Sequence, residues 1–495
     1  MPVLPLTAGV ELGREQLGGK AWGIAHMLRL GVPVPPAFVI TTDECRRYHE
    51  AGDRVAQDVL DALPQAMAHL EQQTGHRFGG GERPLLVSVR SGAPTSMPGM
   101  MDTVLNLGIT GEVQDALAAL SGDTAFAADV ARRFTEQFAA IVGEAPPADP
   151  WEQLHHAIAA VFASWRSRRA ITYRKERGLG EEGGTAVTVQ AMVFGNLDDR
   201  SGTGVLFTRN PLTGGAEPYG EWLVRGQGED VVSGSHDPHH LDALETDLPQ
   251  VHAQLLELAT TLEREGRDVQ DIEFTVQSGK LWLLQTRAAK RSAPAAVRLA
   301  VLLEQEGVID RAEALDHVRP EHVAAMLSTH VDPAARAGAQ VLATGRPASP
   351  GVVHGVVVTD VDEAEDRALA GEDVILARPT TNPDDVHAMA VVKGIVTEVG
   401  GATSHAAVVS RELHVACVVG VGAGVATALE GREVTLDADN GELLAGRVRT
   451  ERLTEHDDEA LHTLGQWARD EAGADDAVSL TEIFRRRHER TAAPA

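Results

Sequence analysis

The segment Gly400-Gly401-Ala402-Thr403-Ser404-His405-Ala406-Ala407 places one histidine where a strand is expected to pass into a helix. Residues 394–399 form a short β-branched run that ends in glycine, whereas residues 406–413 have the apolar spacing of a helix. Ser404 is the expected N-cap, and His405 then lies in the first helical turn. Such a position favours a neutral imidazole and stabilises a phosphoryl group bound to it. We therefore interpret His405 as a candidate phosphoryl carrier.

Composition limits the class of protein. A chain of 495 residues with 43% hydrophobic and 23% charged residues is typical of a soluble protein with several domains. The formal net charge of −28 argues against a nucleic-acid or anionic-membrane partner. Two cysteines, Cys45 and Cys417, are too few for a disulfide framework or a cysteine-rich metal site. The sequence shows no signal peptide and no apolar run long enough to span a membrane, so we expect a cytoplasmic protein.

The order of patterns predicts a multidomain protein of the α/β and α+β classes. Residues 1–290 mix helical and strand patterns and predict a nucleotide-binding unit of two lobes. Residues 291–340, including one expected helix over 311–326, read as a helical connector. Short β-branched runs alternate with helices over 341–450, which predicts a compact α/β domain. Residues 451–495 predict a tail with one modest helix and a solvated basic cluster at 485–487.

Two segments of the first unit have the chemistry of phosphate binding. Gly18-Gly19-Lys20 forms a glycine turn with a lysine at the start of a helical pattern; the glycine spacing and Ala21 exclude a P-loop, and an ordinary capped helix would give the same pattern. The expected buried strand 85–90 ends at Arg90 and leads into a Gly/Met/Pro-rich loop that contains Gly99. An arginine fork followed by such a loop can bind polyphosphate and close over it.

Residues 271–287 predict a β-hairpin with a polar face. If Ser278-Gly279-Lys280 form a three-residue loop, Glu273 opposes Gln285 and Asp271 opposes Arg287 on one face. A two-residue loop would move the two pairs to different faces. We favour the three-residue loop, because the polar quartet is otherwise divided between core and solvent. Two carboxylates suit Mg²⁺ bridging phosphates, and Arg287 can neutralise charge on a transferred group; an exposed polar face with cross-strand pairs is the alternative.

The segments around His405, Ser88–Pro98 and Leu30–Phe38 resemble pyruvate phosphate dikinase and phosphoenolpyruvate synthase. The resemblance implies an ATP-grasp-like nucleotide-binding domain followed by a swivelling phosphohistidine domain. It also implies ATP or phosphate contacts for Lys20, Arg90, Gly99, Glu229 and Gln285, and metal ligation by Asp271 and Glu273. His405 and Arg287 then have catalytic roles, and Thr403 matches a threonine that regulatory kinases modify in dikinases.

By this resemblance, ATP and phosphate would charge His405 with release of AMP and pyrophosphate, with Mg²⁺ as cofactor. Only 49 residues follow Gly446, whereas a pyruvate-binding (β/α)₈ barrel needs about 250, so we expect a separate barrel protein as partner. One alternative is an enzyme like phosphoenolpyruvate synthase or an antibiotic-phosphorylating enzyme, which uses water in place of phosphate. Another is a non-catalytic, ATP-binding regulatory subunit of a complete dikinase.

Overall fold

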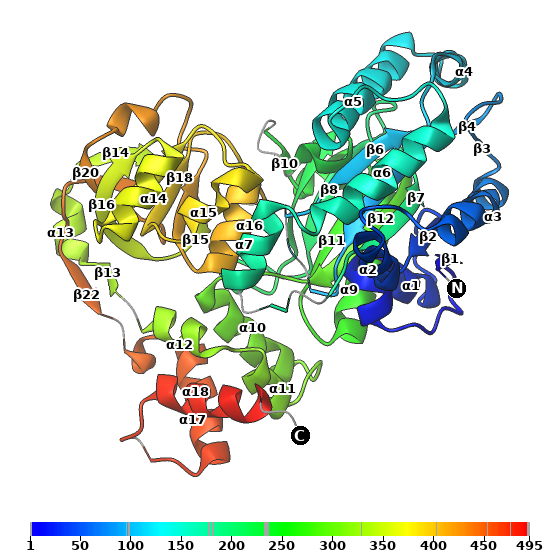
Figure 1. Cartoon of the computed structure of the whole chain (residues 1–495). Coiled ribbons are helices and arrows are strands. Elements are labelled where there is room, and N and C mark those ends of the chain that lie inside the picture. The colour runs from blue at the N-terminus through cyan, green and yellow to red at the C-terminus, as the bar shows by residue number, and fades with distance from the viewer. Residues whose placement is uncertain are drawn as a thin grey trace. The chain divides into compact units, whose positions relative to one another are not determined.

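The computed structural model describes residues 2–95, 97, 100–176, 179–180, 183–231, 237–327, 329–401, 403–452, 454–475 and 477–492. The chain divides into two compact units. The first comprises residues 1–203, 224–227 and 273–286, and the second comprises residues 204–223, 228–272 and 287–495. Helices and sheets alternate in both, which confirms the predicted mixed α/β class (Figure 1).

The first unit contains a five-stranded sheet in the order β1-β2-β7-β5-β6. The strands are β1 (Val3–Pro5), β2 (Ala37–Ile40), β7 (Ala186–Ala191), β5 (Val87–Gly92) and β6 (Thr103–Leu107). Every residue of β2 and β7 is buried, because helices α1 (Arg14–Arg29), α3 (Gln57–Thr74) and α6 (Pro150–Ser164) pack against the sheet. The sheet therefore fixes α1 and β5, which carry the candidate phosphate-binding residues Lys20 and Arg90. The predicted strand 85–90 is displaced: β5 runs from Val87 to Gly92, so Arg90 lies within the strand and not at its end.

The remaining elements of the first unit are mostly helical. They are α2 (Thr42–Glu50), α4 (Gly111–Ser121), α5 (Thr124–Val142), α7 (Arg168–Glu176), β3 (Arg77–Phe78) and β4 (Pro84–Leu85). Helix α5 ends before the proline-rich segment 145–150, and α6 begins with Pro150 at its first turn and the Asp149 side chain as N-cap. Proline suits that position because the first turn needs no backbone donor there.

A second five-stranded sheet has the order β10-β9-β8-β11-β12. Its strands are β10 (His239–His240), β9 (Tyr219–Val224), β8 (Gly202–Phe207), β11 (Gln270–Gln277) and β12 (Lys280–Ala288). The predicted three-residue loop between β11 and β12 is wrong, because the turn contains only Ser278 and Gly279. Both residues have positive φ (49° and 79°), as a type I′ turn requires, and this turn matches the twist of paired strands.

The histidine-bearing segment belongs to an eight-stranded sheet of the second unit, in the order β14-β21-β20-β16-β17-β18-β19-β15. The strands are β14 (Val341–Thr344), β21 (Glu442–Ala445), β20 (Glu433–Asp437), β16 (Val352–Val358), β17 (Val374–Arg378), β18 (Gly394–Thr397), β19 (Ala416–Val419) and β15 (Arg346–Ser349). Strands β16 to β19 are parallel neighbours, so the loops after β17 and β18 lie at the same edge. The associated helices are α14 (Val361–Leu369), α15 (Val386–Met389) and α16 (His405–Leu413).

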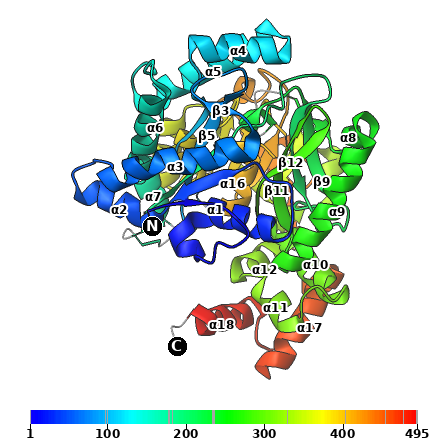
Figure 2. The same ribbon diagram turned by 90° about the vertical axis from the view of Figure 1, so that its right-hand side faces the viewer.

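Five helices of the second unit share one apolar core: α10 (Ala293–Gln305), α11 (Arg311–Asp316), α12 (Pro320–Met326), α17 (Glu459–Ala472) and α18 (Leu480–Ala492). Figures 1 and 2 both show α17 and α18 beside α10 to α12. The expected single helix over 311–326 is two helices, because Pro320 holds Arg319 in an extended conformation.

The tail also differs from expectation. Residues 459–492 form two helices rather than one, and Leu480, Ile483 and Phe484 are at most 4% exposed in the shared core. The predicted solvated basic cluster is wrong for Arg487, which is 16% exposed and pairs with Asp316 of α11. The tail helices are thus part of the connector's core.

The other elements are short or peripheral: η1 (Gly228–Val231), α8 (Asp242–Asp247), α9 (Pro249–Gly266), β13 (Thr329–Val331), α13 (Pro333–Gly338) and β22 (Thr450–Arg452). Strands β13 and β22 pair with each other in an antiparallel two-stranded sheet. Over the described part of the chain, no helix combines the length and apolar character that crossing a bilayer would require.

Candidate active site

His405 is the first residue of helix α16, as the sequence predicts. Ser404 occupies the N-cap position with extended backbone angles (φ −59°, ψ 162°), but its side chain makes no capping hydrogen bond. The Ser404 hydroxyl is instead buried without a hydrogen-bond partner among the described residues. Within the described residues, the Ser404 side chain therefore does not occupy the backbone N–H groups of the first turn of α16, where His405 lies.

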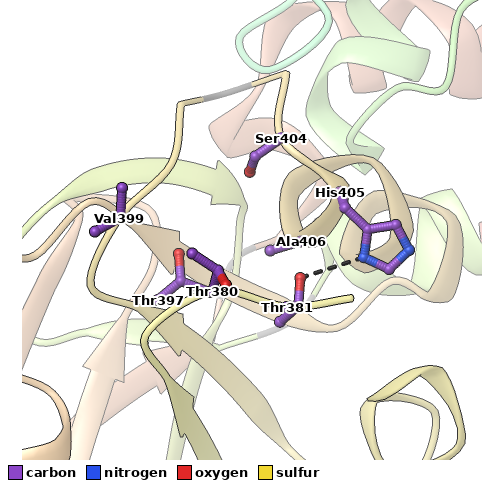
Figure 3. Close-up of a pocket in the computed structure, with 7 residues that line it drawn as sticks. All are labelled: Thr380, Thr381, Thr397, Val399, Ser404, His405 and Ala406. Carbon is purple, nitrogen blue, oxygen red and sulfur yellow. Dashed lines mark hydrogen bonds between the residues drawn. The ribbon is translucent and has the colours of Figure 1, made fainter. Parts of the chain in front are cut away.

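A small polar pocket lies beside His405, at the edge where β17 and β18 end (Figure 3). It is lined by Thr380, Thr381, Thr397, Val399, Ser404, His405 and Ala406. Thr380 and Thr381 follow β17, whereas Thr397 is the last residue of β18. The parallel pairing of these two strands brings both loops to the histidine.

Thr381 orients the His405 ring. Its hydroxyl lies 3.3 Å from Nδ1, within hydrogen-bond distance, and Figure 3 shows the opposite ring nitrogen directed away from Thr381. That nitrogen, Nε2, is buried and has no hydrogen-bond partner among the described residues. If Nδ1 carries the proton and donates it to the hydroxyl, Nε2 has the free lone pair. In this tautomer Nε2 is the ring atom whose lone pair is available.

Burial also sets the charge of this imidazole. Desolvation lowers the pKa of His405 to about 4, so the ring is neutral near pH 7. A neutral imidazole is a nucleophile, whereas an imidazolium is not. The protein therefore holds the His405 ring in its neutral form near pH 7.

Lys20 lies where α1 meets the end of β5. Gly18 interrupts α1 with φ 70° and ψ 163°, and a Cβ on it would lie 1.8 Å from the carbonyl oxygen of Gly92. The Gly19 amide donates to the Ala93 carbonyl at 2.9 Å. Gly18 is therefore needed for the close approach of two backbones, which places Lys20 beside the segment that follows Arg90.

Arg90 is the centre of a polar network in the first unit. Its guanidinium pairs with Glu273 at 3.1 Å and donates to the side-chain oxygens of Gln285 at 3.3 Å and Gln190 at 3.4 Å. Gln285 also donates to Glu273 at 3.2 Å. The structure thus brings Arg90 to Glu273 and Gln285, the pair that the sequence places opposite each other in the hairpin. The prediction omitted Gln190, which is 2% exposed and anchored to the Pro35 carbonyl.

Asp271 and Arg287 form the second predicted pair of the hairpin. The Arg287 Nε donates to Asp271 at 2.8 Å, and the Asp271 side chain is 5% exposed. Both predicted pairs, Glu273 with Gln285 and Asp271 with Arg287, are in direct contact despite the shorter turn. The swap of faces expected for a two-residue loop is therefore not observed.

The hairpin carries side-chain oxygen atoms of the kinds that bind Mg²⁺. Asp271 and Glu273 supply carboxylate oxygens, and Gln285 supplies an amide oxygen; Mg²⁺ prefers such ligands and completes its shell with water and phosphate oxygens. Each carboxylate is paired with an arginine here, which balances its charge. Within the described residues, no group of three or more His, Cys, Asp or Glu side chains is arranged around a common metal position. A site in which two carboxylates and the phosphate oxygens of a nucleotide bind Mg²⁺ does not need a third such side chain.

Two predicted contacts lie beyond what the structure describes. Gly99 is outside the described residues. The backbone of Glu229 lies in η1, but its side chain is outside the description. Thr403 is described and is 1% exposed.

Comparison with known protein families gives two matches. The model for the AMP/ATP-binding domain of pyruvate phosphate dikinase matches residues 14–65 and 51–254, which include Lys20 and Arg90. The model for the mobile domain of PEP-utilising enzymes matches residues 370–441, which include His405. The hairpin at 270–288 lies between the two matched regions.

Curated relatives agree with these models. The chain is 39% identical over 501 residues to a pyruvate, phosphate dikinase of Clostridium symbiosum, with 89% of this chain and 57% of the relative covered. It is 40% identical to the Rhizobium meliloti enzyme, with 88% and 56% covered, and 41% identical to pyruvate, phosphate dikinase 2 of Zea mays, also with 88% and 56% covered. The chain thus spans somewhat more than half the length of these relatives. On these two domain matches and this identity, the chain belongs to the pyruvate phosphate dikinase family of PEP-utilising enzymes.

Proposed function

We propose that this protein is an ATP-dependent phosphotransferase that charges His405. The observation that carries the proposal is the neutral, buried imidazole of His405, whose Nδ1 is held by Thr381 and whose Nε2 has no partner among the described residues. A histidine that only started a helix would not need a hydroxyl placed against one ring nitrogen. The match to an AMP/ATP-binding domain supports ATP as the phosphoryl donor.

The reaction follows the dikinase pattern. Nε2 of His405 attacks the β-phosphorus of ATP, the bond from that phosphorus to the α,β-bridging oxygen breaks, and AMP leaves. Phosphate then attacks the γ-phosphorus of the pyrophosphoryl group on His405, which leaves phospho-His405 and releases pyrophosphate. Lys20, Arg90 and Arg287 offset the negative charge of the transferred groups, and Gln285, Glu229 and Gly99 contact the nucleotide or its phosphates. Mg²⁺ held by Asp271 and Glu273 would neutralise phosphate charge in the same site.

The proposal also names two acceptors: the second acceptor, which takes the γ-phosphoryl group, and the onward acceptor, which takes the phosphoryl group from His405. Phosphate is preferred over water because the most similar relatives reported above are dikinases whose names include phosphate. Pyruvate, named in the same relatives, is the proposed onward acceptor, presented by a pyruvate-binding barrel. A water-using enzyme of the phosphoenolpyruvate synthase type is the alternative for the second acceptor.

The test is incorporation of label from [β-³²P]ATP with Mg²⁺, with and without phosphate. We expect an acid-labile, base-stable phosphate on the purified protein, with pyrophosphate released only when phosphate is present. Release of inorganic phosphate at an equal rate without added phosphate would favour the water-using alternative. A protein that binds ATP but gains no label under either condition would contradict the proposal and favour a non-catalytic subunit.

A further inference from the structure

Thr185 lies where two strands of the first sheet meet the glycine turn of α1. Strand β7 begins at Ala186 and pairs antiparallel with β5, so that Gly92, the last residue of β5, lies opposite Ala186. Thr185 comes directly before this pair and has no exposed surface. A buried hydroxyl is costly unless it is hydrogen-bonded, so its partners must lie within the protein.

The Thr185 hydroxyl has a partner on each of the two strands. It accepts a hydrogen bond from the Gly92 amide at 2.9 Å and donates one to the Ala186 carbonyl at 3.1 Å. A hydroxyl group can accept and donate at once, whereas a methyl group can do neither. Serine at this position would therefore keep both bonds, and valine would lose both.

The residue before Thr185 is fixed by packing. A Cβ on Gly184 would lie 2.7 Å from the carbonyl oxygen of Thr42 and 3.1 Å from the Cβ of Cys45, both residues of α2. The backbone at Gly184 thus lies directly against that helix. Thr185 therefore presents its hydroxyl to Gly92 from a rigid position.

The segment that Thr185 holds is the one that packs on the glycine turn. The Gly92 carbonyl oxygen lies 1.8 Å from where a Cβ of Gly18 would be, and the Ala93 carbonyl accepts a hydrogen bond from the Gly19 amide at 2.9 Å. A Cβ on Gly92 would lie 3.4 Å from the Cβ of Lys20, which is van der Waals contact. Because such close packing transmits displacements, a shift of the Gly92 peptide would move Lys20 as well.

We propose that Thr185 is a positioning residue, which fixes the Gly92 peptide and through it the placement of Lys20 for the phosphates of ATP. The inference rests on the proposed function for the role of Lys20, but the contact between Thr185 and Gly92 does not. Thr185 is fully buried, so it acts through Gly92 and touches no reacting atom. Its loss should weaken the binding of ligands that carry the transferred phosphates.

The first test compares the affinities for ATP and AMP, measured by calorimetry, because AMP lacks the β- and γ-phosphates. Loss of one neutral hydrogen bond changes an equilibrium by about two- to twelvefold. Thr185→Val should weaken ATP binding by a factor in that range and leave AMP binding unchanged, whereas Thr185→Ser should bind both as the wild type does. Equal losses for the two ligands would overturn the proposal. Wild-type affinity for ATP in Thr185→Val, or a Thr185→Ser variant that behaves like Thr185→Val, would also overturn it.

Thr110→Val is the matched control. The Thr110 hydroxyl also accepts a hydrogen bond from a backbone amide, that of Val113 at 3.2 Å, but it caps helix α4. Its loss should lower stability and leave both affinities unchanged. An equal fall in ATP affinity in this variant would show that the effect of Thr185→Val is general damage, which would overturn the proposal.

A double-mutant cycle tests the route through Lys20. Lys20→Met removes the charge and should itself weaken ATP binding. If Thr185 acts through Lys20, Thr185→Val should weaken ATP binding no further in the Lys20→Met background. Losses that multiply in the double variant would overturn the proposal.

Hydrogen exchange tests the contact without ligand or catalysis. Peptides covering residues 90–95 should exchange about two- to twelvefold faster in Thr185→Val than in the wild type, because the Gly92 amide loses its acceptor, whereas peptides from α4 should not change. Wild-type protein that gains no label from ATP would contradict the proposed function and leave this measurement valid. Unchanged exchange over 90–95 would overturn the positioning role even if labelling succeeds. Should exchange rise throughout Thr185→Val, the variant is unfolded, and Thr185→Ala is then judged by the same criteria.

Discussion

Thr381→Val is the substitution that most directly tests how His405 is prepared for chemistry. Valine has nearly the shape of threonine but lacks the hydroxyl that lies 3.3 Å from His405 Nδ1. The variant should therefore fold normally and lose the group that fixes the ring and its tautomer. The neutral tautomer with hydrogen on Nε2, which has no lone pair there, then becomes populated.

The size of the effect follows from the strength of one neutral hydrogen bond. Such a bond contributes about 0.5–1.5 kcal/mol, which corresponds to a rate lower by about two- to twelvefold. Thr381→Ser should recover most of the rate, because serine retains the hydroxyl. The ATP affinity should not change, because Thr381 lies in the loop after β17 and the proposed nucleotide contacts are elsewhere in the chain.

The assay is single-turnover labelling of His405 from [β-³²P]ATP, followed by identification of the phosphorylated nitrogen by ³¹P NMR. Wild-type protein should carry phosphate on Nε2, and Thr381→Val should form the same isomer more slowly. Phosphate on Nδ1 in the wild-type protein would refute the assignment of the nucleophile. A Thr381→Val variant that labels at the wild-type rate would show that the hydroxyl has no orienting role.

Four further outcomes follow from the same geometry. His405→Ala should bind ATP in calorimetry with nearly wild-type affinity and take up no label; undiminished labelling would remove the carrier assignment. Arg287→Ala should label ~10²–10³-fold more slowly, the scale for one donor at a developing charge, and Asp271→Asn should weaken the dependence on Mg²⁺, whereas Thr275→Val on the same strand should matter less. Thr403→Glu should stop charging, because the Thr403 hydroxyl donates a hydrogen bond to the buried carboxylate of Glu221 in β9, and a second carboxylate would be placed against it; labelling at the normal rate would contradict this. The labelling rate should stay level from pH 8 down to about pH 5, since the pKa of His405 is lowered to about 4 by burial, and a fall centred near pH 6.5 would disprove that shift.

The elements that local patterns specify were predictable. The strand-to-helix transition at His405 follows from a β-branched run, two glycines and an apolar helical period, and the structure has β18 and α16 at those positions. The separation of α5 from α6 follows from the prolines at 145–150 in the same way. The break in the helix expected over 311–326 had a local signal, because proline disfavours the helical conformation in the residue before it.

Other features depend on contacts between distant residues. Thr381 is 24 positions from His405, and Glu221 is 182 positions from Thr403, so no local period relates them. Gln190 joins Arg90 across paired strands, and a buried polar residue in an apolar strand was the only signal for it. The turn at Ser278 was missed because a serine with positive φ is uncommon, and the twist of the hairpin outweighs that local cost.

The choice of a hydroxyl as the partner of His405 Nδ1 has a chemical consequence. A carboxylate at that place would favour the imidazolium and raise the pKa of the ring, so part of the protein would be protonated and unreactive near neutral pH. Thr381 fixes the ring without adding charge, and burial then lowers the pKa to about 4. The cost appears in stability: the unfolded histidine binds a proton below about pH 6.5 and the folded one only below about pH 4, so folding stability is lost as the pH falls between these values. The protein keeps His405 buried and neutral despite this loss of stability at low pH. We expect such a cost where the ring must act as a nucleophile.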